Sequence, residues 1–127
     1  MEQDTSSGRI SRRWGLDFAR LVAQEIGAKI GGTTNNRCIF KGRSAEIKSA
    51  RGANGLFLLY ESSLKHARVF IFAYKDEKGR CEVYAVEKRA LNRMLRPYRG
   101  RRHVGAQTVK LDMVRRRASC IARFTSL

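Results

Sequence analysis

The sequence has few of the residues that mark disulfide-rich, zinc-binding or membrane-spanning proteins. Its three cysteines, Cys38, Cys81 and Cys120, show no CxxC spacing. An odd number of isolated cysteines argues against a disulfide framework and a zinc site, so we interpret them as reduced, small hydrophobic residues of a cytoplasmic protein. The longest apolar run, residues 69–74, falls far short of the roughly 18 residues that a membrane span needs. We therefore expect no membrane partner.

Export signals and several common catalytic motifs are missing as well. Residues 1–13 are polar and lack the apolar stretch of a secretory signal peptide. The chain contains no Walker loop, no dinucleotide-binding glycine signature and no Ser-His-Asp spacing. His66 has no second histidine or acid at ligand spacing, and His103 lies among arginines. These histidines are therefore expected to be surface residues and not a metal site or a catalytic triad.

Acidic residues are scarce, because 11 Asp and Glu stand against 27 Lys and Arg, for a formal net charge of +16. Residues 1–87 hold 15 basic and 10 acidic side chains, whereas residues 88–127 hold 12 basic side chains and one acid. Such an excess indicates a polyanionic partner, most commonly nucleic acid. DNA is the expected ligand and RNA the alternative, while an acidic protein or a merely solvated face would show the same charge.

The basic segment, residues 88–117, contains more arginine than lysine. This bias favours phosphate contacts, because a guanidinium binds phosphate in a bidentate geometry. Tyr98 stands among the arginines and offers a ring on which a base or sugar can stack. The residues expected to contact nucleic acid are Arg51, Arg93, Arg96, Arg99, Arg101, Arg102, Arg115, Arg116 and Arg117.

The spacing of apolar residues predicts a disordered tail, residues 1–10, followed by a single domain, residues 11–127. A helix is expected to begin at Ser11 and to end at Gly27. Strands are predicted at residues 37–41, 43–50, 56–60, 68–74, 81–86 and 107–111, and a helix at residues 87–96. This order indicates an α/β (α+β) class, with the N-terminal helix packed on a mixed, mostly antiparallel sheet that is followed by a helix.

The pattern that can carry chemistry is Ala45-Glu46-Ile47-Lys48-Ser49. Residues two apart on a strand point to the same face, so Glu46 and Lys48 project side by side. A carboxylate can hold a divalent cation while the adjacent ammonium steadies an attacking water or a phosphorane oxygen. The alternative is an ion pair on a solvated face of the sheet.

From Trp14 to Leu95 the chain resembles the PD-(D/E)XK nuclease superfamily, which has the restriction-endonuclease-like fold. The resemblance rests on the leading helix with Glu25, the hairpin around Gly42, the Glu46-Ile47-Lys48 motif and the apolar strands that follow. It implies a magnesium-dependent endonuclease that hydrolyses DNA phosphodiester bonds, with Mn²⁺ as the alternative ion. By the same resemblance Glu46 is a metal ligand, Lys48 the catalytic lysine and Glu25 the helix carboxylate.

The chain departs from this family where a metal-binding aspartate is expected. Asn35-Asn36 occupies that place, and no Asp lies between Asp17 and Asp76. An asparagine carbonyl can ligate a hard cation but adds no charge. Either Asn36 completes a metal site with Glu46 and Glu25, or the domain is a catalytically inactive module that binds DNA or RNA. Oligomeric state stays open, with a homodimer as one alternative, because residues 56–60 fit either the core or a partner surface.

Overall fold

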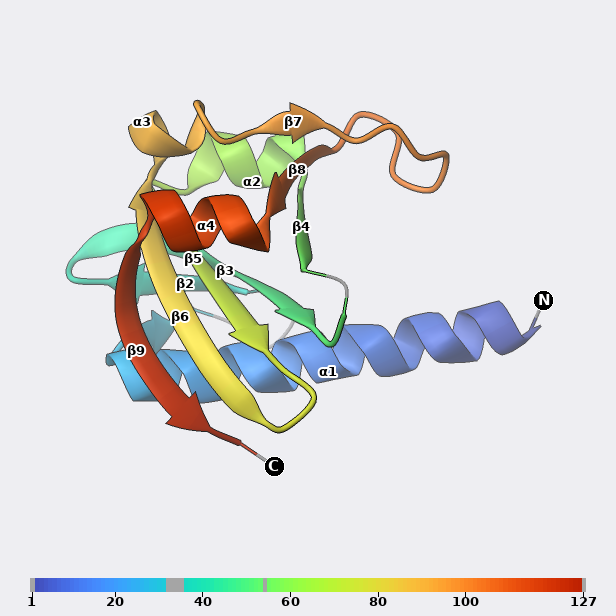
Figure 1. The fold of residues 1–127 in the computed structure, drawn as a ribbon, viewed down its shortest axis with the longest axis horizontal. Helices are drawn as coiled ribbons and strands as arrows, with labels where there is room; N and C mark the ends of the chain where they lie inside the picture. Colours follow the sequence, from blue (N-terminus) through green and yellow to red (C-terminus); the bar gives the residue numbers. More distant parts are fainter. Residues whose placement is uncertain (1, 32–35, 54, 127) are drawn as a thin grey trace.

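The computed structural model describes residues 2–31, 36–53 and 55–126 of the chain. These residues form a mixed α/β structure, in agreement with the fold class predicted from the sequence (Figure 1). The elements follow in the order α1 (Glu2–Ile26), β1 (Lys29–Ile30), β2 (Arg37–Phe40), β3 (Arg43–Arg51), β4 (Leu56–Leu59), α2 (Glu61–His66), β5 (Val69–Lys75), β6 (Arg80–Glu87), α3 (Lys88–Leu91), β7 (Arg96–Pro97), β8 (Gln107–Lys110), α4 (Leu111–Arg117) and β9 (Ser119–Thr125).

The larger sheet has six strands in the order β1-β2-β3-β5-β6-β9. Its neighbouring strands are antiparallel except β3 and β5, which run parallel along the length of both strands. A parallel pair requires a crossover connection, which β4 and α2 provide here. The expected mixed, mostly antiparallel sheet is therefore confirmed.

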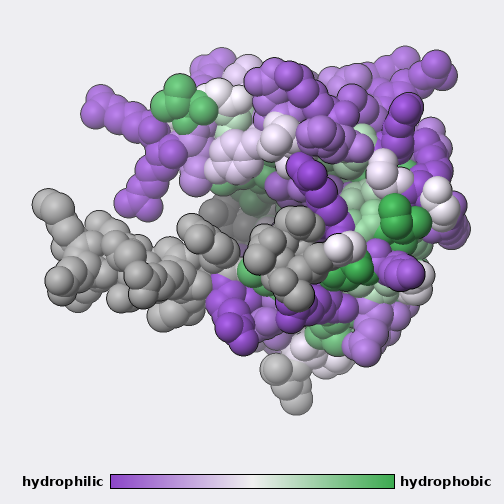
Figure 2. Space-filling model, turned by 180° about the vertical axis from the view of Figure 1, so that it is seen from behind, coloured by the Kyte–Doolittle hydropathy of each residue, from purple (hydrophilic) through white to green (hydrophobic). Residues whose placement is uncertain are grey.

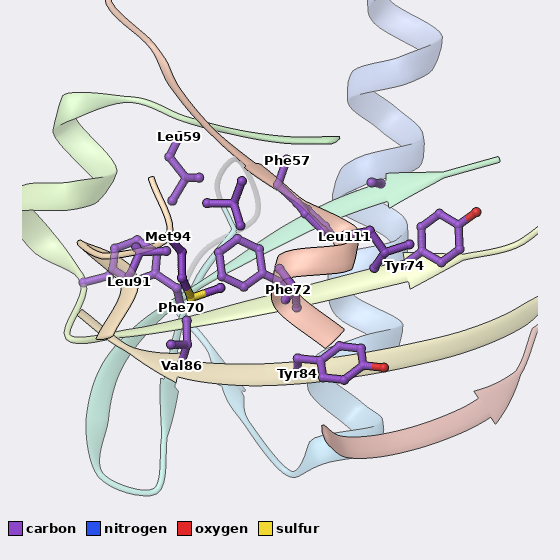
Figure 3. Packing of buried hydrophobic residues seen from close by; sticks show 14 residues of the cluster. Phe57, Leu59, Phe70, Phe72, Tyr74, Tyr84, Val86, Leu91, Met94 and Leu111 are labelled. Carbon is purple, nitrogen blue, oxygen red and sulfur yellow. The ribbon is translucent and has the colours of Figure 1, made fainter. Parts of the chain in front are cut away.

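The two faces of the larger sheet have separate hydrophobic cores. On one face, α1 packs Phe18 and Val22 against Ile47, Ile71 and neighbouring residues. On the other face, Phe70 and Phe72 of β5 pack against Phe57 and Leu59 of β4 and against Leu91, Met94 and Leu111 from later elements (Figure 3). Val114 of α4 belongs to the same cluster. The second layer there contains the smaller sheet, of order β4-β8-β7, together with α2 and α4 (Figure 1).

The hairpin between β2 and β3 matches its sequence prediction. Lys41 and Gly42 connect the strands, and both have positive φ, at 51° and 78°. This backbone is typical of a two-residue type I′ turn, whose twist suits the strands on either side. The turn sets the pairing of Arg37 with Glu46 and of Cys38 with Ala45. The hairpin thereby places the Glu46 motif on an interior strand.

The first helix begins at Glu2, well before the predicted start at Ser11. It therefore runs through residues that the sequence assigns to a disordered tail. Once a helix has formed, each further residue adds a backbone hydrogen bond at little nucleation cost, so weak helix formers can extend a helix that is anchored elsewhere. Phe18 and Val22 anchor this one to the sheet.

Several later elements differ from the predicted ones. Residues 56–59 form β4, but this strand lies in the smaller sheet and not among the central strands of the larger one. Phe57 and Leu59 are fully buried, so the run belongs to the core. The helix predicted over residues 87–96 is the short α3, because Arg96 pairs with Thr108 in an extended conformation. Proline disfavours helical geometry in the residue before it, which explains why Arg96 is extended.

The C-terminal part of the chain, for which the sequence indicates no clear pattern, forms α4 and β9. β9 pairs with β6 at the edge of the larger sheet. Within the described residues, every helix is too short or too polar to cross a membrane.

Candidate functional site

The motif residues Glu46 and Lys48 lie on the face of β3 that is opposite to α1. Their partners on β5 are Phe70 and Phe72, which belong to the core of that face. The Glu46 side chain is 9% exposed and the Lys48 side chain 17%. The solvated-face alternative requires exposed side chains, so the structure argues against it.

The two charged groups are close but do not satisfy each other. Lys48 Nζ lies 3.8 Å from Glu46 Oε2. That oxygen is buried and has no hydrogen-bond partner among the described residues. Burial lowers the pKa of Lys48, and the neighbouring Glu46 carboxylate partly opposes this shift. A buried carboxylate oxygen without a donor is costly and uncommon, so the contacts of the described residues do not account for its position.

Aromatic residues connect Lys48 to the basic loop, residues 98–106, between β7 and β8. Lys48 Nζ lies 5.9 Å from the centroid of the Tyr60 ring. The Tyr60 hydroxyl shares a hydrogen bond of 2.5 Å with His103 Nδ1, and the ring of Tyr98 packs edge-on against His103 at 5.4 Å. These contacts connect His103, within the arginine-bearing loop, through Tyr60 to Lys48.

Glu46 also lines a small pocket of about 150 Å³ under α2. Ser63 and His66 of α2 and Arg37 of β2 contribute to its wall. The Ser44 hydroxyl donates a hydrogen bond to the backbone oxygen of His66, which fixes the end of α2 against β3. His66 thus lies nearer to the motif than its position in a polar stretch of sequence indicates.

Asn36 lies just before β2 and beside the motif. Its backbone oxygen accepts a hydrogen bond of 2.9 Å from the Ile47 amide, between the two motif residues. Its side-chain Oδ1 is buried and has no hydrogen-bond partner among the described residues. Asn36 and Lys48 line the same pocket of about 380 Å³, whose lining does not include Glu46. The neighbouring Asn35 lies outside the described residues.

Glu25 is not brought to this group. It is exposed on α1, which covers the opposite face of the larger sheet. On that face lies Cys81, whose thiol pKa is raised mainly by burial and slightly by the Glu25 charge. A helix-borne carboxylate on the far side of a sheet cannot share a ligand with Glu46, because the sheet itself separates them.

The described residues contain no group of three or more His, Cys, Asp or Glu side chains placed to hold a metal ion. The donors that remain are the buried oxygens Glu46 Oε2 and Asn36 Oδ1. Magnesium is commonly held by one or two carboxylates together with water and substrate phosphate. Glu46 with a substrate phosphate is the minimum set for such an ion, whereas Asn36 lines a different pocket and Glu25 lies on the other face of the sheet.

The predicted phosphate-binding arginines form more than one group. Arg99, Arg101 and Arg102 are exposed on the basic loop, which projects from the body of the protein on the side where α1 begins (Figure 1). From behind, hydrophilic side chains cover most of the surface, and the largest projections lie at the upper left (Figure 2).

The other arginines of the basic segment have different surroundings. Arg93 and Arg117 are exposed, and Arg96 and Arg116 bond to backbone oxygens at 2.8 and 3.4 Å. Arg115 instead binds both oxygens of Glu82, at 2.5 and 3.0 Å. Arg115 therefore forms a structural ion pair. The exposed arginines near the candidate site are those of the basic loop.

Sequence reasoning missed the contacts that Tyr60, His103 and Trp14 make. Tyr60 follows an apolar run and His103 lies in a charged one, so neither pattern indicates that they meet. Trp14 begins the apolar stripe of α1 and packs against the core, as that pattern favours, and it also lines the same pocket as Lys48. No spacing rule could have found these contacts, because each joins elements far apart in the chain. A comparison of the chain with family models and with curated proteins finds no match.

Proposed function

We propose that this protein binds nucleic acid and hydrolyses phosphodiester bonds at Glu46 and Lys48, on a restriction-endonuclease-like fold. The observation that carries the proposal is the buried, unpartnered Glu46 Oε2 with Lys48 Nζ 3.8 Å away. Removing a carboxylate from water costs several kcal/mol unless it is paired and hydrogen-bonded. A protein retains such a group where function requires it, and a divalent cation or a water near a phosphate supplies the missing interaction.

The implied cofactor is Mg²⁺, with Mn²⁺ as the alternative. When bound, the ion polarises the phosphate and favours deprotonation of water. Glu46 would hold it together with phosphate oxygens of the nucleic acid, so the single carboxylate predicts weak binding in the absence of nucleic acid.

The chain's own residues act on the water and on the phosphate charge. A water oxygen attacks phosphorus, the bond from phosphorus to the leaving oxygen breaks, and that oxygen gains a proton. Lys48 lies where its ammonium stabilises the added negative charge on the phosphorane oxygens. The proton that the attacking water loses passes to solvent, which supplies the proton that the leaving oxygen gains.

The charge distribution supports a nucleic-acid substrate. The exposed arginines of the basic loop supply phosphate contacts, and the Tyr60–His103 contact places that loop beside the motif. A strand bound along the loop therefore reaches Lys48 without rearrangement of the fold. DNA is the proposed ligand, and RNA competition measures how far the preference extends.

The test is cleavage of supercoiled, linear and single-stranded DNA in Mg²⁺ or Mn²⁺. We expect Glu46→Gln and Lys48→Met each to lower the rate by about 100-fold or more, since each removes a charge that acts on the transition state. The matched control is Glu61→Gln and Lys65→Met, which breaks an exposed Glu–Lys pair of 3.1 Å on α2. The control variants should cleave at the wild-type rate.

A variant that restores the metal-binding aspartate of the PD-(D/E)XK nucleases extends the same experiment. Asn36→Asp adds a negative charge beside the motif, so it should increase the rate and lower the Mg²⁺ concentration that gives half-maximal cleavage. Wild-type protein and Asn36→Asp that both leave every substrate intact in either metal would contradict the proposed hydrolysis.

The second candidate is a binding module without catalysis. It is favoured by the absence of a group of three metal-ligating side chains among the described residues. In that case Glu46→Gln binds nucleic acid with the wild-type affinity, and neither protein cleaves it. Replacing Arg99, Arg101 and Arg102 together with Gln should weaken binding and reduce the slope of log K against log salt by up to about 3, because each lost phosphate contact removes close to one released counterion.

A further inference from the structure

The pocket shared by Lys48 and Asn36 exists because β2 is shorter than β3. β2 pairs with β3 from Arg43 to Glu46, and beyond the Ile47 amide the remaining length of β3 has no strand beside it on that edge among the described residues. The next strand in the chain, β4, belongs to the smaller sheet. The resulting pocket of about 380 Å³ lies between α1, the end of β3 and β4. This volume is within the range of small-ligand sites.

The walls of this pocket suit a flat ring. Trp14 is half-buried and stacks on Phe18 with ring centroids 5.0 Å apart, which holds its indole in place. The Arg51 guanidinium lies 4.4 Å from the centroid of the Trp14 ring. Leu56 and Leu58 form an apolar wall from β4. Unstacked bases pack against such aromatic, guanidinium and aliphatic surfaces.

The polar groups of the pocket suit an anion that also makes hydrogen bonds. Lys48 and Arg51 are cationic, and none of the described residues that line the pocket is acidic. Ser49 Oγ is buried and has no hydrogen-bond partner among the described residues. Its hydroxyl can both donate and accept, which matches the mixed polar edge of a base or a sugar.

We propose that this pocket binds one unstacked nucleotide, with its base between the Arg51 guanidinium and the leucine wall and its phosphate near Lys48. The inference rests on the proposed nucleic-acid ligand and deepens it. The base and the phosphate together account for the apolar wall, the two cations and the unpartnered Ser49 hydroxyl. Because a paired base cannot leave its duplex without cost, the preferred substrate carries an unpaired nucleotide, as in a single strand, gap or junction.

Trp14 provides a direct readout, because it is the single tryptophan of the sequence. The full-length protein is titrated with deoxyadenosine monophosphate while tryptophan emission is followed, and calorimetry serves as the second measurement. We expect a saturable change in emission. Deoxyadenosine and inorganic phosphate, tested separately, should each bind at least about tenfold more weakly, since each occupies half of the pocket.

Two substitutions test the assignment of the pocket. Arg51→Gln should weaken the affinity for deoxyadenosine monophosphate by about tenfold or more. Ser49→Val should weaken it by about three- to tenfold, the effect of one lost hydrogen bond. The matched control is Arg89→Gln, which removes the same charge from an exposed position on α3. Its binding curve should equal that of the wild type, and circular dichroism confirms that all variants are folded.

The outcomes separate this inference from the proposed hydrolysis. Duplex binding or cleavage with no response of Trp14 to millimolar deoxyadenosine monophosphate would overturn the pocket and leave the proposed function standing. Equal affinities of Arg51→Gln and Arg89→Gln for the nucleotide would also overturn it. Saturable, Arg51-dependent binding in a protein that cleaves nothing would support the pocket and contradict hydrolysis.

Discussion

Two carboxylates, Glu46 on β3 and Glu82 on β6, lie on the same face of the larger sheet and differ in how they are bonded. Both flank β5, where their strand partners are Phe70 and Tyr74. Glu82 accepts two hydrogen bonds from Arg115 and one of 2.8 Å from the Tyr84 hydroxyl. Glu46 has Lys48 Nζ at 3.8 Å and an oxygen without a donor among the described residues.

The difference separates a structural carboxylate from one that is available to a ligand. Arg115 and Tyr84 lower the pKa of Glu82, since both stabilise the ionised form. A satisfied group of this kind contributes to folding, because its bonds replace those it made to water. Glu46 is buried without such bonds, and the proposed function assigns the missing interaction to substrate or metal.

Among the predictions from this comparison, the largest effect on the free energy of unfolding is expected when Glu82 loses its bonds to Arg115. Arg115→Ala removes two charge-assisted hydrogen bonds and leaves the Glu82 carboxylate underpaired, so we expect a loss of about 1–3 kcal/mol in the free energy of unfolding. Arg116→Ala on the same helix is the control, and it should change stability by less than about 0.5 kcal/mol. Urea denaturation measures both. Equal effects of the two substitutions would contradict the structural role of the Glu82–Arg115 pair.

A smaller effect of opposite sign is expected at Glu46. Replacing a buried ion pair with apolar residues of similar volume is often neutral or stabilising. The double variant Glu46→Leu with Lys48→Met should therefore gain up to about 2 kcal/mol, although it would lose any hydrolysis. Lys48→Met alone should be destabilising, because it leaves the Glu46 charge without its neighbour. A double variant less stable than Lys48→Met alone would indicate that the pair holds the fold together.

The smallest expected effect is the pH dependence of stability from Glu82. Because the folded pKa of Glu82 is lowered, its contribution is complete above the ordinary glutamate pKa of about 4.3 and is lost as the pH falls through the lowered folded value. Urea midpoints between neutral pH and pH 3 should therefore fall less steeply in Arg115→Ala than in the wild type. Parallel curves for the two proteins would contradict this assignment.

Much of the fold could be predicted from local patterns. The Lys41-Gly42 turn, the alternation along β3 and the apolar stretch of β5 each depend on neighbouring residues, and the structure confirms all three elements. The place of β4 could not be predicted, because an apolar run fits either sheet until its partner strand is known. That partner, β8, lies about 50 residues further along the chain.

The candidate site divides in the same way. Strand periodicity alone places Glu46 beside Lys48, since residues two apart share a face. The burial of that face, the distance of Glu25 from it and the meeting of Tyr60 with His103 depend on long-range packing. Trp14 packs against the core as its spacing predicts, but only the tertiary structure shows that it also lines the pocket of Lys48.

The sequence by itself determined the basic charge, the helix and strand types of most elements and the side-by-side projection of Glu46 and Lys48, because each depends on composition or on residues within a few positions. The tertiary structure alone decided that this pair is enclosed, that Arg115 serves Glu82 and that Arg51 lies over Trp14. Those facts depend on which face of the sheet α1 covers and which the later elements cover, and contacts between distant segments set that choice.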